Sequence, residues 1–144
     1  MGDGPAPLNL LLVEDSPADV FLVREAMETE GLPFRLVLAE DGEAAMQVLN
    51  RVDAETEPAP HVLLVDLNVP RRDGIQVLER ARRSPVCGGI PVIVISSSDS
   101  PADRQRAFAL GASEYFRKPS TLDEFMQLGR IVRMVACPAK TSAV

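Results

Sequence analysis

The chain has 144 residues, of which 46% are hydrophobic and 25% charged, as is typical of one soluble globular domain. Its net charge of −6 does not favour binding to nucleic acid, which is itself negatively charged. No apolar run approaches the roughly 20 residues that a membrane-spanning helix needs. Residues 1–5 lack the basic region of a signal peptide, so we expect a cytoplasmic protein with no nucleic-acid partner and no membrane partner.

Strand and helix patterns alternate along the whole chain. A continuously apolar run at Leu8–Val13 predicts a strand that is covered on both faces. Ser16 and Pro17 suit the start of a helix, and Asp19 lies in its first turn. In chain order, we expect strands at 8–13, 34–39, 61–66, 90–95 and 113–117, and helices at 17–30, 42–52, 74–83, 101–111 and 122–136.

These elements form one domain over residues 8–136, with a disordered N-terminus at 1–7 and a flexible C-terminal tail at 137–144. Strands that alternate with helices predict a parallel sheet with helices on both faces. In such sheets, ligands bind beyond the carboxyl ends of the strands.

Polar side chains stand at those carboxyl ends. Asp66 ends an apolar run, and a carboxylate at the end of a buried strand is costly unless its charge is compensated. The pair Glu14-Asp15 follows the first strand, Ser96 follows the fourth, and Lys118 follows the fifth. Carboxylates, a hydroxyl and a cation at one edge suggest a site for Mg²⁺ and phosphate.

Four motifs carry a family resemblance. They are Leu12-Val13-Glu14-Asp15, Val65-Asp66 with Pro70 and Asp73-Gly74, the run from Pro91 to Ser96, and the run from Gly111 to Pro119. In this order they resemble the receiver domain of a two-component response regulator. The resemblance implies an α/β fold of the flavodoxin-like, doubly wound type, with five parallel strands in the order 2-1-3-4-5 and five helices.

Residues 14–20 and 66–74 are similar to those of the single-domain regulators that serve bacterial and cyanobacterial phytochromes. This finer resemblance implies a receiver-only protein that takes its phosphoryl group from a sensor histidine kinase, here a bacterial phytochrome. It also implies a homodimer that forms through the fourth helix, the fifth strand and the last helix. No effector domain is expected after residue 136, so signalling would proceed by contact or as a phosphate shuttle.

The resemblance also implies roles for the metal and phosphate residues. Asp66 would be the phosphoacceptor, and Mg²⁺ the cofactor. Asp15 and Asp66 would be direct metal ligands, Asn68 would offer its backbone carbonyl, and Glu14 would act through water. Lys118 would pair with the phosphoryl oxygens.

Three further residues receive roles from the resemblance. Ser96 would donate a hydrogen bond to the phosphoryl group and move toward it. Tyr115 would be the switch aromatic that rotates inward in response. Pro119 would follow a cis peptide bond. The alternative for Tyr115 is a half-buried strand tyrosine whose hydroxyl stays in water.

Three alternatives to a signalling receiver follow from the same fold. A haloacid-dehalogenase-like phosphatase needs a second Asp where this chain has Asn68, and Pro70 also departs from its pattern. A flavodoxin-type module would place Glu14-Asp15-Ser16 against a phosphate, which those acids would repel. A docking module that works without phosphorylation is the third. We therefore expect no enzymatic activity beyond Mg-dependent self-phosphorylation and slow self-dephosphorylation.

Overall fold

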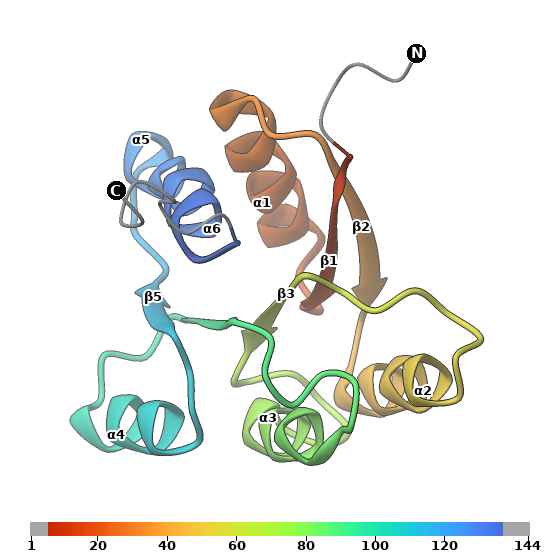
Figure 1. The fold of residues 1–144 in the computed structure, drawn as a ribbon. Helices are drawn as coiled ribbons and strands as arrows, with labels where there is room; N and C mark the ends of the chain where they lie inside the picture. Colours follow the sequence, from red (N-terminus) through yellow and green to blue (C-terminus); the bar gives the residue numbers. More distant parts are fainter. Residues whose placement is uncertain (1–5, 137–144) are drawn as a thin grey trace, which may run out of the picture.

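Parallel pairing of five strands builds the sheet that organises the chain, of which the computed structural model describes residues 6–136. The strand order is β2-β1-β3-β4-β5, as the resemblance predicted (Figure 1). The strands are β1 (Leu8–Val13), β2 (Phe34–Ala39), β3 (Val62–Asp66), β4 (Val92–Ser96) and β5 (Glu114–Arg117). Each is short and rich in Val, Ile and Leu, which suits strands that are buried on both faces.

Helices cover both faces of this sheet. One face carries α1 (Pro17–Glu30), α5 (Leu122–Phe125) and α6 (Gln127–Ala136); the other carries α2 (Gly42–Asp53), α3 (Gly74–Arg83) and α4 (Pro101–Ala109) (Figure 1). Alternate residues of β1 divide between the two cores, with Leu10 and Leu12 packing toward α1 and Leu11 and Val13 toward α2 and α3. The sheet thus separates two apolar layers, and the two ends of its strands are left to carry other side chains.

Element boundaries agree with the sequence-based expectations to within two residues, apart from the last helix. β4 begins at Val92 because Ile90 closes a turn onto the Cys87 carbonyl, and α4 stops at Ala109 because Gly111 adopts a φ of 91°. The predicted last helix comes as α5 and α6, with Met126 between them. The Gly129 N–H bonds the Met126 carbonyl three residues back, so the helix tightens locally where the two pieces meet.

The predictions for the two ends of the chain concern residues 1–5 and 137–144, which lie outside the described residues. Ala6 and Pro7 belong to no helix or strand. Between residues 6 and 136, no helix is both long enough and apolar enough to cross a membrane.

Candidate functional site

The sheet register gathers the predicted site residues at one edge. Val13 pairs with Val65, Asp66 pairs with Ile95, and Ser96 pairs with Arg117. The residues that end or follow these strands therefore come together beyond the carboxyl ends of β1, β3, β4 and β5; they are Glu14, Asp15, Asp66, Ser96 and Lys118. The sequence identified all five of them from the ends of its apolar runs.

Lys118 is the cation of this cluster. Its Nζ donates hydrogen bonds of 2.7 Å to Asp66 Oδ2 and of 2.7 Å to Asp19 Oδ2, and lies 3.1 Å from Glu14 Oε1. Burial disfavours the charged ammonium, but the bonds to Asp19 and Asp66 outweigh it and raise the pKa of Lys118 above its usual value. Lys118 therefore stays charged and offsets part of the negative charge around it.

Three carboxylates converge beside that lysine. Glu14 is 1% exposed and Asp66 5%, whereas Asp15 faces solvent. One oxygen from each of the three lies within 4.8 Å of the others. Burial, together with the charge of Asp66, raises the pKa of Glu14 to about 7, while Lys118 and the Ser16 N–H act in the opposite direction. Such crowding of like charges is unfavourable without a cation.

The Glu14 carboxylate shows how incompletely this charge is satisfied. Its Oε2 accepts the Ser16 N–H at 3.1 Å, and its buried Oε1 has the Lys118 ammonium 3.1 Å away as an ion-pair partner, although that contact does not have hydrogen-bond geometry. A single lysine is thus shared by Glu14, Asp19 and Asp66, so the negative charge here is only partly offset. Hard oxygen donors in this arrangement fit a divalent cation.

The loop after β3 fixes the orientation of Asp66. The Asn68 N–H donates to Asp66 Oδ1 at 2.8 Å, which leaves Oδ2 for Lys118. The loop is itself held against α2, because the Gly42 N–H donates to the Pro70 carbonyl at 3.0 Å. A side chain at Gly42 would put its Cβ 1.8 Å from the Arg72 carbonyl oxygen, so only glycine allows this close approach.

Ser96 and Tyr115 are linked because both form hydrogen bonds with the backbone of Ser98. The buried Ser96 Oγ accepts the Ser98 N–H at 3.0 Å, and the Tyr115 hydroxyl donates to the Ser98 carbonyl at 3.1 Å. The guanidinium of Arg104 lies 4.8 Å from the centre of the Tyr115 ring. Tyr115 is buried and its hydroxyl bonds to protein, so the alternative of a half-buried tyrosine with a wet hydroxyl is wrong.

The expectation of a cis bond before Pro119 is also wrong, because residues 6–136 contain no cis peptide bond. Proline reduces the preference for trans to about 0.5–1 kcal/mol but does not reverse it. Here Lys118 is already placed by a 2.7 Å hydrogen bond from its N–H to the Ser96 carbonyl. The lysine thus reaches the site with Pro119 in trans.

Sequence reasoning missed one member of the cluster, Asp19. Its place in the first turn of a helix explained it as a helix-start acid, and the Asp19 N–H does bond to Ser16 Oγ at 3.2 Å. Its contact with Lys118 joins residues that are 99 positions apart. The available signal was topological, since the start of α1 faces the same sheet edge as the end of β5.

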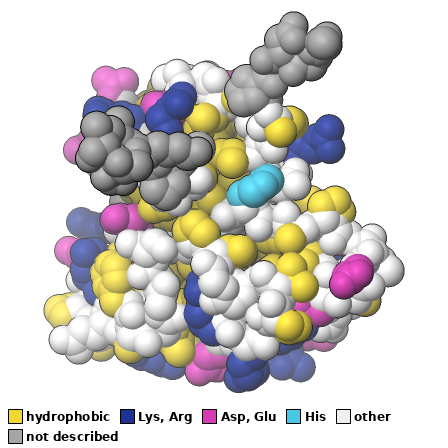
Figure 2. Space-filling view, viewed as in Figure 1, with side chains coloured by type: hydrophobic (Ala, Val, Ile, Leu, Met, Phe, Trp, Pro, Cys, Tyr) yellow, Lys and Arg dark blue, Asp and Glu magenta, His cyan; other side chains and the backbone are white. Residues whose placement is uncertain are grey.

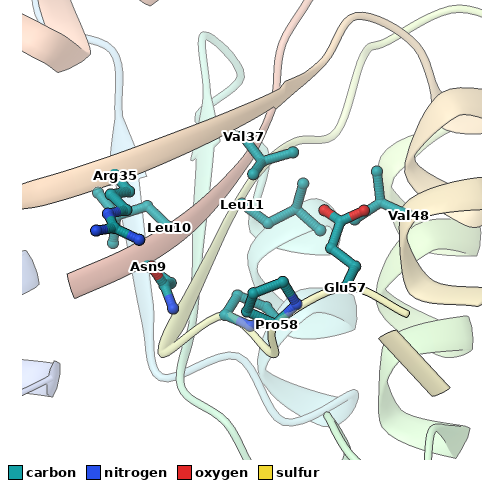
Figure 3. Close-up of a pocket in the computed structure, with 9 residues that line it drawn as sticks. Asn9, Leu10, Leu11, Arg35, Val37, Val48, Glu57 and Pro58 are labelled. Atoms are coloured by element: carbon teal, nitrogen blue, oxygen red, sulfur yellow. The ribbon is translucent and has the colours of Figure 1, made fainter. Parts of the chain in front are cut away.

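A cavity of about 120 Å³ lies at the opposite end of the sheet (Figure 3). Figure 3 shows Leu11 and Val37 from the strands facing Val48 from α2 and the loop residues Glu57 and Pro58. The Glu57 carboxylate accepts a 2.9 Å hydrogen bond from Arg51 Nε. Figure 2 shows hydrophobic side chains in the middle of the face in view, with most charged side chains around its rim. Among residues 6–136, the one group of three acids close enough to share a metal ion lies at the carboxyl ends of the strands, away from this cavity.

Comparison with known proteins agrees with this geometry. The sequence model described as "Response regulator receiver domain" matches residues 10–130. The chain is 35% identical to the response regulator Rcp1 of Synechocystis over 123 residues, which covers 85% of this chain and 84% of Rcp1.

Two solved structures share the fold at similar identity. The phosphorylated cyanobacterial phytochrome response regulator RcpA has a TM-score of 0.84 and 31% identity, covering 94% of this chain and 98% of RcpA. The Mn²⁺-bound form of Rcp1 has a TM-score of 0.79 and 33% identity, covering 89% of this chain and 93% of Rcp1. The chain is therefore related to phytochrome response regulators, one of which was solved with a divalent metal.

Proposed function

The chain belongs to the response regulator receiver domain family, and from this premise we propose that Asp66 accepts a phosphoryl group from a sensor histidine kinase. Receiver domains are typically signalling modules without an enzymatic product of their own. The observation that carries the proposal is the Asp66 carboxylate, which is nearly buried yet held 2.7 Å from the Lys118 ammonium beside two further acids. The likeness to Rcp1 and RcpA supports a phytochrome kinase as the donor, and a cytoplasmic location is part of this proposal.

The transfer step needs a nucleophile and charge neutralisation. A carboxylate oxygen of Asp66 forms a bond to phosphorus while the phosphorus–nitrogen bond of the kinase phosphohistidine breaks, and the departing imidazole takes up a proton. Lys118 offsets the negative charge of the phosphoryl oxygens. The Ser96 Oγ accepts the Ser98 N–H, so its own O–H is free to donate to a phosphoryl oxygen.

We assign Mg²⁺ to the three acids. Asp15 and Asp66 would hold it directly, Asn68 would add its backbone carbonyl, and Glu14 would act through water. The convergence of three carboxylates, whose oxygens lie within 4.8 Å of one another, supports this fit. When bound, Mg²⁺ supplies positive charge that lowers the repulsion between the acids and the incoming phosphoryl group.

The response to phosphorylation is a conformational change on the side of the molecule formed by α4, β5 and α5. Tyr115 is the switch residue, and its hydroxyl bond to Ser98 joins it to the Ser96 hydroxyl. Phe108 on α4 and Leu122 on α5 expose large apolar side chains, which favours a homodimer through this side. Light scattering on phosphorylated and unphosphorylated protein tests this part, and a strict monomer in both states contradicts it.

The proposal is tested by incubation with acetyl phosphate and Mg²⁺, read on a phosphate-affinity gel, with Asp66→Asn as the control. We expect a shifted band that depends on Asp66. Wild-type protein that stays unshifted with acetyl phosphate and with a phosphorylated kinase would instead support the docking module that works without phosphorylation. A family match over residues 10–130 already argues against the phosphatase and flavodoxin alternatives.

A further inference from the structure

Lys118 makes one contact that its pairing with Asp66 does not require. Its ammonium donates equally short hydrogen bonds of 2.7 Å to Asp66 and to Asp19. The side chains of Lys118 and Asp19 are 14% and 24% exposed, so this ion pair is largely shielded from water. Charge-assisted hydrogen bonds of this length are among the stronger polar contacts in proteins.

Asp19 is anchored before it meets the lysine. It belongs to the first turn of α1, where its N–H bonds to the Ser16 side chain at 3.2 Å. A lysine side chain has about 2 kcal/mol of rotamer entropy to lose when it is fixed in one position. A carboxylate on a capped helix can hold the flexible ammonium of Lys118 in place.

Asp19 is not one of the acids grouped at the cation site, although it shares Lys118 with two of them. The grouped acids are Glu14, Asp15 and Asp66, whose oxygens lie within 4.8 Å of one another. Asp19 contacts Lys118 and is not a member of that group. Loss of its charge should therefore act on the lysine and remove no ligand of the cation.

We propose that Asp19 is a positioning residue that holds the Lys118 ammonium beside Asp66, at the place where the transferred phosphoryl oxygens arrive. This inference rests on the proposed function of Asp66. Once Asp66 carries the phosphoryl group, Lys118 exchanges its Asp66 contact for a phosphoryl oxygen. The Asp19 contact persists through that exchange, so the ammonium keeps its position while its other partner changes.

The test compares rate constants for labelling by acetyl phosphate at saturating Mg²⁺. Asp19→Asn keeps the side-chain size and the N–H bond to Ser16 but removes the charge. We expect labelling to slow by roughly three- to tenfold, the cost of weakening one charge-assisted hydrogen bond, with Mg²⁺ affinity nearly unchanged. Asp19→Glu, which restores the charge, should recover part of the rate.

A matched control lies at the other end of the same helix. Glu30 accepts a 2.7 Å hydrogen bond from Arg133 and is 22% exposed, so Glu30→Gln removes a similar ion pair far from Lys118. It should label at the wild-type rate. Thermal unfolding of both variants separates a loss of helix stability from a loss of lysine positioning.

The decisive measurement repeats Asp19→Asn in a Lys118→Ala background. If Asp19 acts through the lysine, the second substitution causes no further slowing. Equal slowing in both backgrounds, or an unchanged or faster rate for Asp19→Asn alone, overturns the inference while labelling of the wild type upholds the proposed function. A wild type that takes no label on Asp66 overturns both.

Discussion

The two ends of the sheet have opposite characters, although β1 contributes to both. At its carboxyl end, β1 leads into Glu14 and Asp15, which crowd against Asp66 and Lys118. Toward its amino end, Leu11 lines an apolar cavity of about 120 Å³. One end concentrates charge that is costly to bury; at the other end, residues 6–136 form an apolar cavity and no group of three acids close enough to share a metal ion.

The cavity and the group of charged side chains thus lie at different ends of the sheet. The better enclosed hollow lies beside Val37 and Val48, away from every residue that the sequence assigned to the site. The carboxyl end of the sheet is recognised by its group of three acids, two of them buried, and by the lysine that they share. Here the predicted site is recognised by its group of ionisable side chains, and the cavity of Figure 3 does not coincide with it.

The largest expected effect is on phosphorylation. A substitution at the charged end should abolish it, and a substitution at the apolar end should leave it unchanged. Asp66→Asn removes the nucleophile and should abolish labelling by acetyl phosphate. Val48→Ala enlarges the cavity and should label at the wild-type rate, because Val48 lines the cavity at the opposite end of the sheet. A labelling defect in Val48→Ala, measured on folded protein by the gel assay, would break the separation between the two ends.

The next effect concerns stability and should belong to the apolar end. Leu11 is buried in the core between β1 and α2, and Leu11→Ala should lower the free energy of unfolding by about 2–5 kcal/mol, toward the smaller value because a cavity already adjoins the site. Urea unfolding monitored by circular dichroism measures this loss. A cost well under 1 kcal/mol would show that the cavity end contributes little to the core.

A smaller effect, of opposite sign, is expected at the charged end. Asp15→Ala removes one of three crowded carboxylates and should raise metal-free stability by up to about 1 kcal/mol. The same change should weaken Mg²⁺ binding by at least about tenfold, since Asp15 is assigned as a direct ligand. Thermal unfolding with and without Mg²⁺ measures both effects. If Mg²⁺ raised the Tm of Asp15→Ala as much as that of the wild type, the metal would not be bound by Asp15.

The smallest effect tests a carboxylate that is part of neither the acid group nor the cavity lining. Asp53 accepts hydrogen bonds from Ser84 and Arg80, which hold its pKa below the usual value. A lowered folded-state pKa stabilises the fold above the unfolded-state value near 3.9, and this contribution disappears as pH falls through the folded-state pKa. The stability difference between wild type and Asp53→Asn should therefore narrow as the pH falls below about 4. A difference that stays constant to pH 2 would contradict this account.

The alternation of apolar runs with helical patterns predicted the sheet, and the family resemblance implied its strand order. The five strand-end residues of the site were predicted because four of the apolar runs end in polar side chains. The sequence could not predict Asp19, whose partner Lys118 is 99 positions away and is brought close by the packing of α1 beside the carboxyl edge. It also could not predict the isomer before Pro119, since proline permits cis without requiring it. The break at Met126 depends on hydrogen-bond geometry that capping signals do not specify.

Gly42 offers a way to observe the site from a distance. Its N–H bonds to the Pro70 carbonyl, and the loop after β3 fills the space that any side chain at this position would need. The amide resonance of Gly42 is therefore a spectroscopic reporter of that loop, located on α2 and separate from the Asp66 carboxylate. A shift of this single peak during titration with Mg²⁺ would record loop movement without any label inside the charged cluster.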